Sequence, residues 1–268
     1  LFPFVPVTAK IGAGGMGEVF LAEDTRLERK AAIKFLPAEL AADQDRRLRF
    51  LIEAKAASAL NHPHVCVVYD VGETRDGVPY IAMEFVEGNP LDVLVKQGPL
   101  PIPRTIEIIS QVADALDAAH TGRVIHRDIK PANIILNERG KVKVLDFGLA
   151  KRMPADSSDL QAKTTDMQQT QSGQVLGTPS YMSPEQALGQ NLDHRTDIFS
   201  MGVVLYELTT GQKPFSGGSF GETVNRIVNS QPTAIARLNY DVPPELERIT
   251  LKCLQKSPDR RYQTAREL

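Results

Sequence analysis

The chain has 268 residues, of which 42% are hydrophobic and 24% charged, and its formal net charge is −2. This length is sufficient to bury a substantial core, either in one large domain or in two coupled lobes. The nearly balanced charge gives no electrostatic reason to expect a nucleic acid or an anionic membrane surface as partner. No apolar run in this segment reaches the ~18 residues that span a bilayer.

The cysteines and the two ends of the chain bear on its context. Cys66 and Cys253 lack the spacing of a metal site, so we expect reduced thiols in a cytosolic compartment. The sequence begins with Leu1 rather than Met and stops at Leu268, within a stretch whose pattern is helical. We therefore expect a domain that has been excised from a longer protein.

The first part of the chain has the pattern of a small β-sheet with one helix. Short β-like runs occupy residues 8–11, 18–22, 31–36, 66–71 and 80–85. Residues 43–60 carry apolar side chains at i, i+3 and i+4, which predicts an amphipathic helix. Its apolar positions are Leu48, Leu51, Ile52, Ala56, Ala59 and Leu60.

From about residue 87 the pattern is mainly α-helical. Helices are predicted over 104–121, 196–210, 220–229 and 244–255, with short strands at 134–136 and 143–145. Helix 196–210 is apolar nearly all round, which predicts a buried central helix. The fold class is therefore α+β with two lobes, residues 1–86 and 87–268, joined by a hinge at about 86–90.

Residues 12–19 read Gly-Ala-Gly-Gly-Met-Gly-Glu-Val and fit the pattern G-x-G-x-x-G-x-V. Glycines let backbone N–H groups approach a phosphate closely. By itself the motif also fits a plain glycine-rich turn, and a dinucleotide fingerprint would require a helix directly after the glycines. Residues 19–22 read instead as a strand, so the sequence favours a β-hairpin that covers a phosphate.

Lys34 lies in an apolar strand, and Glu53 follows it by nineteen residues in the predicted helix. By itself, such a lysine is more often a surface residue whose ammonium group is solvated. Most glutamates in helices are also solvated. Downstream of the glycine motif, the two residues together predict an ion pair.

Residues 126–133 read His-Arg-Asp-Ile-Lys-Pro-Ala-Asn, and Asp146-Phe147-Gly148 begins thirteen positions after Asn133. Asp128 can accept a hydroxyl proton, Lys130 supplies positive charge, and Asn133 and Asp146 can hold Mg²⁺. Phosphoryl transfer requires these groups, because its catalysis is mostly positioning and neutralisation of phosphate charge. An isolated Asp would usually be a turn residue or an ion-pair partner, but the order and spacing of the two blocks argue against that interpretation.

Two further charged features are predicted to hold the fold together. Asp197 lies in the helix predicted to be buried, where a charge is costly unless it is hydrogen-bonded. We therefore expect its carboxylate to accept backbone N–H groups from the turn at 126–127. Glu185 and Arg261 are predicted to form a distant ion pair, with two unrelated surface charges as the alternative.

With these motifs in this order, residues 8–268 resemble a eukaryotic-like protein kinase. The glycine loop and the string Tyr-Met-Ser-Pro-Glu-Gln at 181–186 are most similar to bacterial serine/threonine kinases. The resemblance implies ATP and Mg²⁺ as cofactors and serine or threonine hydroxyls of proteins as acceptors, a preference that rests on Lys130 and Thr178. Two departures, Ser183 for the usual Ala and Ala31 for the usual Val, remove no catalytic group.

The resemblance also implies a role for each matching residue. Asp128 orients the substrate hydroxyl and accepts its proton, and Lys130 steadies the γ-phosphate. Asn133 and Asp146 hold Mg²⁺. Lys34 contacts the α- and β-phosphates and is held by Glu53. The implied nucleotide site consists of Ile11, Gly12, Ala13, Gly14, Gly15, Met16, Gly17, Glu18, Val19, Ala32, Lys34, Met83, Glu84, Val86 and Ile135.

Within that site the resemblance gives the adenine a defined place. Ile11, Val19, Ala32 and Ile135 sandwich the base. Met83 is the gatekeeper, and residues 84–86 form the hinge whose backbone bonds to adenine.

Regulation is implied as well, through the polar segment 153–174. Arg127 is expected to receive a phosphate on this activation loop, with Thr170 and Ser172 as the main sites and Thr164 and Thr165 as secondary ones. The same resemblance implies a cytoplasmic location, as the cytoplasmic domain of a membrane-anchored protein, and a homodimer for autophosphorylation.

Two alternatives stay open. A nucleotide-binding pseudokinase scaffold would lack the equivalents of Lys34, Asp128 or Asp146, all of which are present. A kinase that phosphorylates a small molecule would generally lack the long polar loop and the string at 177–185.

Overall fold

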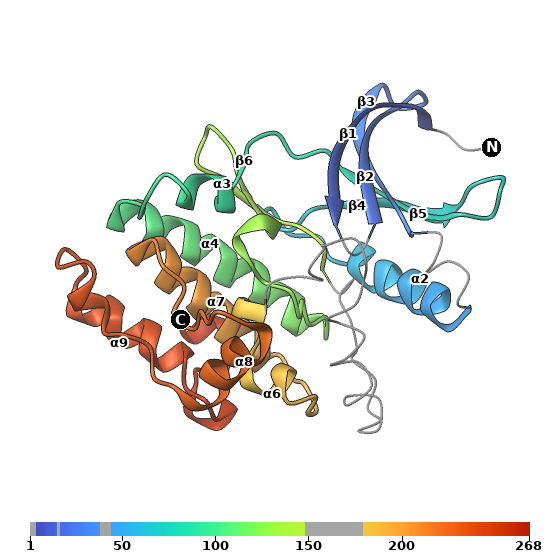
Figure 1. Ribbon diagram of the computed structural model, residues 1–268. Coiled ribbons are helices and arrows are strands. Elements are labelled where there is room, and N and C mark those ends of the chain that lie inside the picture. Colours follow the sequence, from blue (N-terminus) through green and yellow to red (C-terminus); the bar gives the residue numbers. More distant parts are fainter. Residues whose placement is uncertain (1–3, 15–16, 38–43, 148–178) are drawn as a thin grey trace.

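The computed structural model describes residues 4–14, 17–37, 44–147 and 179–268, and these form two lobes (Figure 1). The N-terminal lobe is an antiparallel sheet with helix α2 (Gln44–Ser58) packed against it. The C-terminal lobe is mainly helical and carries a second, small sheet. The predicted bilobal α+β fold is therefore confirmed.

In the described part of the N-terminal lobe, five strands form one antiparallel sheet in the order β1–β2–β3–β5–β4. Their bounds are β1 (Phe4–Gly14), β2 (Gly17–Asp24), β3 (Arg29–Phe35), β4 (Val68–Glu73) and β5 (Pro79–Glu84). The five predicted strands are confirmed, but some bounds were wrong. The first strand already begins at Phe4, and the fourth begins at Val68 because residues 64–66 bond instead to β8 in the other lobe.

The described helices of the C-terminal lobe are α3 (Leu91–Val95), α4 (Ile102–Thr121), α6 (Pro184–Ala187), α7 (Arg195–Thr210), α8 (Phe220–Asn229) and α9 (Pro244–Cys253). Single 3₁₀ turns are η1 (Pro131–Asn133), η2 (Pro179–Tyr181), η3 (Ile235–Arg237), η4 (Pro258–Arg260) and η5 (Ala265–Glu267). The small sheet contains β6 (Asn89–Pro90), β7 (Ile134–Leu136) and β8 (Val142–Val144) in that order. The four predicted helices and both predicted strands are confirmed within a few residues, and the expected helical end of the chain is only the turn η5.

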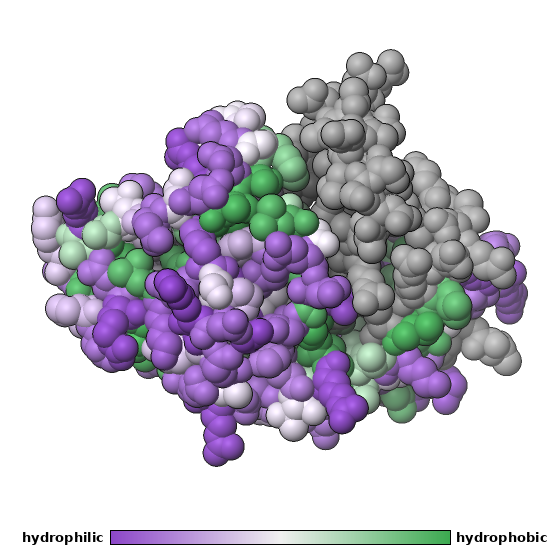
Figure 2. All heavy atoms as spheres, turned by 90° about the horizontal axis from the view of Figure 1, so that it is seen from below, coloured by the Kyte–Doolittle hydropathy of each residue, from purple (hydrophilic) through white to green (hydrophobic). Residues whose placement is uncertain are grey.

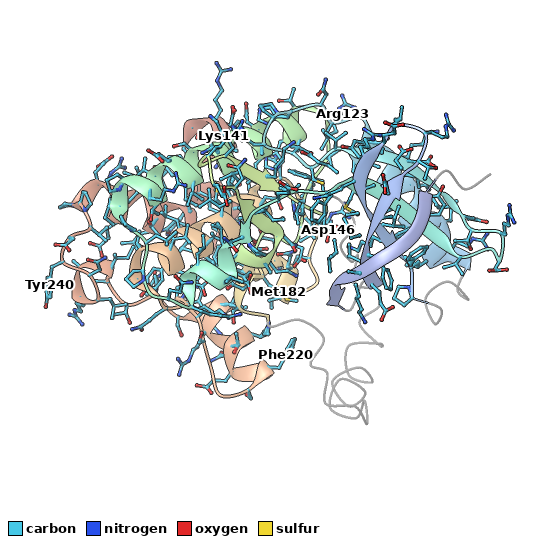
Figure 3. The ribbon with its side chains drawn as sticks, turned by 90° about the horizontal axis from the view of Figure 1, so that it is seen from above. Arg123, Lys141, Asp146, Met182, Phe220 and Tyr240 are labelled. Carbon is cyan, nitrogen blue, oxygen red and sulfur yellow. The ribbon has the colours of Figure 1, made fainter. Side chains whose placement is uncertain are left out.

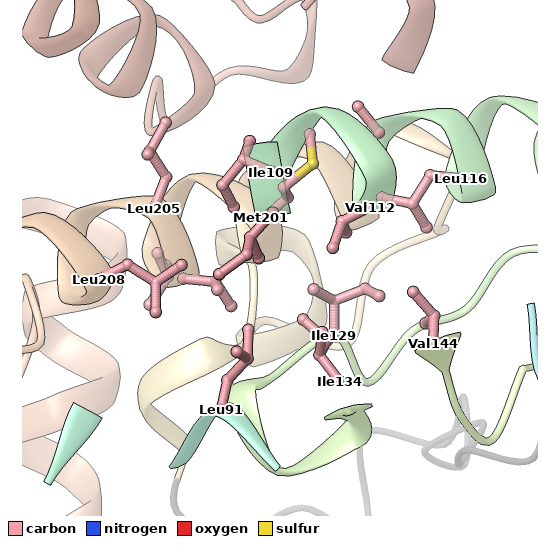
Figure 4. Close-up of a cluster of buried hydrophobic side chains, with 14 of the residues drawn as sticks. Leu91, Ile109, Val112, Leu116, Ile129, Ile134, Val144, Met201, Leu205 and Leu208 are labelled. Carbon is pink, nitrogen blue, oxygen red and sulfur yellow. The ribbon is translucent and has the colours of Figure 1, made fainter. Parts of the chain in front are cut away.

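Helix α7 is the centre of the C-terminal lobe. Every residue from Thr196 to Thr210 is buried, as the all-round apolar pattern predicts. The α7 side chains Met201, Leu205 and Leu208 share one core with residues of α3, α4, β7 and β8 (Figure 4). Ile129, next to the candidate base Asp128, is fully buried in the same core. The loop that carries Asp128 is thus anchored by an apolar side chain.

The apolar face that the sequence predicts for α2 is confirmed only in part, because Leu51 and Leu60 pack against core clusters but other members do not. Leu48 and Ile52 are each 57% exposed, whereas Phe50, Ala54 and Ala57 are buried. Phe50 and Ala54 pack in one cluster with side chains of β3 and β5. Two alanines contribute little to a hydrophobic pattern, but their small side chains let the helix backbone lie close to its neighbours. The buried face thus combines the large Phe50 with two small alanines.

The described part of the face seen from below is mostly hydrophilic. Seen from below, the coloured part shows hydrophobic side chains only in small groups (Figure 2). Such scattered apolar residues are normal on a folded protein. No helix in the described ranges is both long and apolar enough to cross a membrane.

Both cysteines are buried, as free thiols. Cys66 lies in the N-terminal lobe beside β5 and Cys253 ends α9. Burial raises the pKa of the Cys66 thiol, and it raises the pKa of Cys253 to about 12.

The predicted ion pair between Glu185 and Arg261 is confirmed. Both guanidinium Nη atoms donate to the carboxylate at 2.7 Å, and the side chains are only 6% and 0% exposed. Arg261 also donates to the backbone oxygens of Gln255 at 2.8 Å and Arg195 at 2.9 Å. Burial alone would raise the pKa of Glu185, but Arg261 outweighs it and holds this pKa below its usual value. The pair ties α6 to the end of the chain.

Arg261→Met should lower the free energy of unfolding by about 3–5 kcal/mol at pH 7, because a buried carboxylate is left without its partner. Without Arg261, burial places the pKa of Glu185 above its unfolded value, so Glu185 becomes neutral on acidification and the loss shrinks toward pH 4. Urea unfolding at both pH values measures this. Arg248→Met is the matched control, because Arg248 and Glu245 form a solvent-exposed pair whose loss should leave the free energy of unfolding nearly unchanged. Equal losses in the two variants would contradict the analysis.

Candidate active site

The loop between α4 and β7 carries Asp128, Lys130 and Asn133, and it is held by the fully buried carboxylate of Asp197 on α7. Asp197 accepts the backbone N–H of His126 at 2.8 Å and that of Arg127 at 2.7 Å, which confirms the prediction. His120, at the end of α4, adds a bond from Nε2 at 2.8 Å, a partner that sequence reasoning missed. These bonds hold Arg127 at φ = 65°, a left-handed conformation that is uncommon for a residue with a side chain.

The ring of His126 connects this loop to the segment that carries Asp146. Its Nδ1 accepts the backbone N–H of Asp128 at 3.2 Å, so the proton belongs on Nε2, which donates to the Leu145 carbonyl at 2.7 Å. The ring is fully buried and packs edge-on against Phe147, with centroids 4.7 Å apart. Both blocks of the sequence motif thus meet through one histidine.

Asp128, Lys130 and Asn133 are brought together, as the sequence motif requires. Lys130 Nζ lies 2.6 Å from Asp128 Oδ2. Asn133 Nδ2 donates to the Asp128 carbonyl at 2.9 Å and to its Oδ2 at 3.1 Å. The Asp128 side chain remains 30% exposed, so an incoming hydroxyl can reach it.

Lys34 and Asp146 meet between the lobes. Lys34 Nζ lies 2.8 Å from Asp146 Oδ2, and the lysine side chain is only 4% exposed. Figure 3 shows Asp146 between the strands of the N-terminal lobe and the helices of the other lobe. Asp146 has φ = 59°, the kind of backbone strain that concentrates at functional sites. Glu53 belongs to α2, but its side chain lies outside the described residues, so its pairing with Lys34 stays a prediction.

The glycine motif forms a β-hairpin. Gly14 of β1 pairs with Gly17 of β2, so a strand follows the glycines and the dinucleotide alternative is excluded. Gly17 has φ = 120°, and a Cβ there would lie 2.0 Å from the Phe35 carbonyl oxygen, so no other residue fits without movement. Gly12 and Ala13 precede the turn and Glu18 follows it. Gly15 and Met16 lie outside the described residues.

The residues predicted to contact adenine mostly pack together. Ala32 and Met83 are buried in one hydrophobic cluster, and Val19 and Val86 pack against it. Leu145 joins the same cluster from the C-terminal lobe, and sequence reasoning missed it. The sequence could have indicated Leu145, because it is the apolar residue directly before Asp146. Ile135 is half-buried on β7, and Ile11 is 44% exposed on β1.

The side chain of Glu84 faces the connection between the lobes. Its Oε2 lies 2.7 Å from Lys143 Nζ and accepts the Val67 N–H at 3.2 Å. Lys143 also donates to the Val65 carbonyl at 3.1 Å. The side chain of Glu84 is thus engaged within the protein, and the contact of its backbone with a nucleotide stays a prediction. Nothing in the local pattern around Lys143 signalled this link.

The described part after residue 178 is fixed to α7. Tyr181 Oη donates to Glu207 Oε2 at 2.6 Å, and the Tyr181 carbonyl accepts from Ser200 Oγ at 2.8 Å. Burial raises the pKa of both Tyr181 and Glu207. Gly148, Thr164, Thr165, Thr170, Ser172 and Thr178 all lie outside the described residues.

The oxygens of Asn133 and Asp146 fit a magnesium ion. Asn133 uses Nδ2 for its hydrogen bonds and Asp146 uses Oδ2 for Lys34. Among the described residues this leaves Oδ1 of each side chain without a donor. Mg²⁺ prefers such hard oxygen ligands and usually takes only one or two carboxylates besides phosphate and water. Accordingly, no cluster of three or more His, Cys, Asp or Glu capable of holding a metal occurs in the described ranges.

Comparison with known proteins identifies the same arrangement elsewhere. Residues 6–268 match the family described as the protein kinase domain. The chain is 46% identical over 262 residues to the serine/threonine-protein kinase PknB of Mycolicibacterium smegmatis, which covers 96% of this chain and 40% of that protein. It is 43% identical to PknB of Mycobacterium tuberculosis, with the same coverage. The chain thus spans about 40% of the length of these curated relatives.

Solved structures agree. The kinase domain of Mycobacterium tuberculosis PknI superposes with a TM-score of 0.76 at 28% identity, covering 99% of this chain and 93% of that one. A double mutant of the same domain gives a TM-score of 0.77. Two lobes joined as described here are thus an arrangement already seen in experimental structures.

Asp197→Asn should lower the free energy of unfolding by about 1.5–3 kcal/mol, because hydrogen bonds to a charged acceptor contribute about that much and an amide turns an N–H toward another donor. Urea unfolding measures the loss. Asp114→Asn, which changes a carboxylate that is 66% exposed and faces His62, is the control and should change stability by less than about 1 kcal/mol. A stability of Asp197→Asn equal to wild type would show that this carboxylate does not hold the loop.

Proposed function

The chain belongs to the protein kinase family, and from this premise we propose that it transfers the γ-phosphate of ATP to serine and threonine hydroxyls of proteins. The observation that carries the proposal is the convergence of Asp128, Lys130 and Asn133 with the pair Lys34–Asp146 at the junction of the two lobes. The named relatives of this domain are serine/threonine-protein kinases, which supports the choice of acceptor.

Each group in the proposed site has a defined task. Asp128 accepts a hydrogen bond from the substrate hydroxyl and takes its proton as the bond to phosphorus forms. Lys130 lies beside Asp128 and balances charge on the transferred phosphate. Lys34, held by Glu53, contacts the α- and β-phosphates, and the backbone of the glycine hairpin covers them.

Asn133 and Asp146 are the proposed ligands of Mg²⁺. When bound, the ion neutralises charge on the β- and γ-phosphates. The present ion pair between Asp146 and Lys34 places a carboxylate and an ammonium side by side, so a nucleotide can bring its metal to one and its phosphates to the other. The adenine is proposed to lie among Ile11, Val19, Ala32, Met83 and Ile135, with hydrogen bonds to the backbone of 84–86.

We also propose autophosphorylation of the polar segment 153–174, in trans between two copies. The protein would act in the cytoplasm, as a catalytic domain at residues 1–268 with lobes 1–86 and 87–268, attached to a membrane-anchored protein. The size of the curated relatives supports a longer full protein. Neither a nucleic acid nor a membrane surface is proposed as a partner of this segment.

Two alternatives make distinct predictions for one experiment. Incubation with labelled ATP, Mg²⁺ and a generic protein substrate, followed by phosphoamino-acid analysis, should yield phosphoserine and phosphothreonine. A pseudokinase scaffold and a small-molecule kinase would both leave the protein unlabelled, and only the small-molecule kinase would transfer label to an added small-molecule alcohol.

Asp146→Asn should nearly abolish transfer and Asp128→Asn should lower it, and the two variants should differ in nucleotide binding. Asp128→Asn should lower kcat and keep the affinity for ATP, because its interaction is made mainly in the transition state. Asp146→Asn should weaken binding of Mg²⁺ with ATP, because it removes a ligand charge. Steady-state kinetics and a magnesium titration of ATP binding measure both. More than a tenth of wild-type turnover in Asp146→Asn would contradict its role.

Self-reaction should place phosphate on Thr170 and Ser172, with Thr164 and Thr165 as secondary sites. A phosphate adds about −1.5 to −2 charges and can bond to Arg127, which orders the segment that carries the string at 177–185. Mass spectrometry after incubation with ATP locates the phosphates. The double variant Thr170→Ala/Ser172→Ala should be less active on protein substrate. Full activity without phosphate elsewhere in the segment would refute this switch.

A further inference from the structure

The side-chain amide of Gln186 links two parts of the site that are far apart in sequence. Helix α6 begins with a reciprocal cap, in which Ser183 Oγ accepts the Gln186 backbone N–H at 3.2 Å and Gln186 Oε1 accepts the Ser183 N–H at 2.9 Å. The other end of the amide, Nε2, donates to the carbonyl oxygen of Arg127 at 2.7 Å. Gln186 therefore uses its acceptor for its own helix and its donor for the loop that carries Asp128.

The acceptor of that bond is the peptide unit directly before the proposed base. The oxygen of the Arg127–Asp128 peptide is held by Gln186, and the N–H of the same unit is held by His126 Nδ1 at 3.2 Å. Arg127 already has φ = 65°. A peptide unit in an uncommon conformation is thus fixed at both of its polar ends. Its orientation determines the direction in which the Asp128 side chain leaves the backbone.

Gln186 can act as a fixed point because α6 is anchored elsewhere. Glu185, the preceding residue, is bound by both Nη atoms of buried Arg261 at 2.7 Å. Ser183 Oγ also meets Thr196 Oγ1 on α7, and both residues are fully buried. These contacts hold α6 in place independently of the loop. The hydrogen bond from the Gln186 amide therefore fixes the Arg127 carbonyl relative to α6.

We propose that Gln186 is a positioning residue for phosphoryl transfer, because its amide N–H holds the Arg127–Asp128 peptide in the orientation that aims the Asp128 carboxylate. The inference rests on the proposed role of Asp128. It makes the segment after residue 178 part of the catalytic geometry, since α6 must be seated before Asp128 is aimed. An amide is needed at 186 because one side chain must accept from Ser183 and donate to Arg127, and a carboxylate only accepts.

The test is Gln186→Glu, which keeps the shape and the capping acceptor but points an oxygen at the Arg127 carbonyl. At pH 7.5 kcat should fall at least ~10-fold, the effect of about 1.4 kcal/mol, while KM for ATP and for peptide stays within about twofold. At pH 5.5 the introduced carboxyl, whose pKa the facing carbonyl raises, is partly protonated and can donate again. The ratio of wild-type to variant kcat should therefore narrow on acidification, which a loss of folding alone would not produce.

The chain offers a matched control in Gln111 on α4. Its Nε2 donates to the Gly140 carbonyl at 3.1 Å and its Oε1 accepts the Val142 N–H at 3.0 Å, the same double use of an amide away from Asp128. Gln111→Glu should leave kcat within twofold of wild type at both pH values. An equal loss of kcat in this control would overturn the proposal.

Two other results would also overturn the proposal. One is a kcat of Gln186→Glu within twofold of wild type at pH 7.5. The other is a ratio of wild-type to variant kcat that does not change between pH 7.5 and 5.5. If that variant does not fold, Gln186→Met replaces it; a fall in kcat without a change in KM supports the proposal, and a wild-type kcat refutes it. Asp128→Asn is run beside them. Full activity of Asp128→Asn would show that the assignment of the base has failed, whatever the Gln186 variants do.

Discussion

A single buried carboxylate, that of Asp197, determines where the catalytic loop lies. A charge inside the core of α7 is tolerated only because two backbone N–H groups and an imidazole bond to it. The same bonds hold Arg127 in a left-handed conformation that the loop would otherwise leave. Every residue of α7 from Thr196 to Thr210 is buried, so packing holds the helix in place. The hydrogen bonds of Asp197 then fix the loop that carries Asp128 relative to this helix.

The other buried charges follow the same logic. Lys34 with Asp146 and Glu185 with Arg261 each join segments that are more than 70 residues apart. Buried ion pairs contribute little to stability compared with well-packed apolar residues, because desolvation offsets their attraction. We infer that these pairs serve to position the segments they join. Lys34–Asp146 joins the lobes, Glu185–Arg261 seats α6, and Asp197 seats the catalytic loop, so three charged contacts set the geometry of one site.

Much of this could be predicted from sequence because the chemistry requires particular residues in a particular order. The β-hairpin at the glycines, the buried α7 and both partners of Glu185–Arg261 follow from local pattern and from the cost of burying charge. The face of α2 was predicted only in part, because several apolar registers fit this helix and the one chosen left out Phe50, Ala54 and Ala57, which are buried. Gln186 and Lys143 were missed for a different reason. Their side chains act on backbone atoms of distant segments, and no local pattern records where a carbonyl will lie in the folded chain.

The burial of both cysteines has a consequence for how this protein can be handled. Reaction with maleimides or with peroxide requires a thiolate that is exposed, and burial raises the pKa of Cys66 and Cys253 while the packing around them excludes reagents. We therefore expect neither native thiol to react in the folded domain. A cysteine introduced at Tyr240, which is 89% exposed, would be the sole reactive position, so a fluorophore or spin label could be attached without removing either native residue.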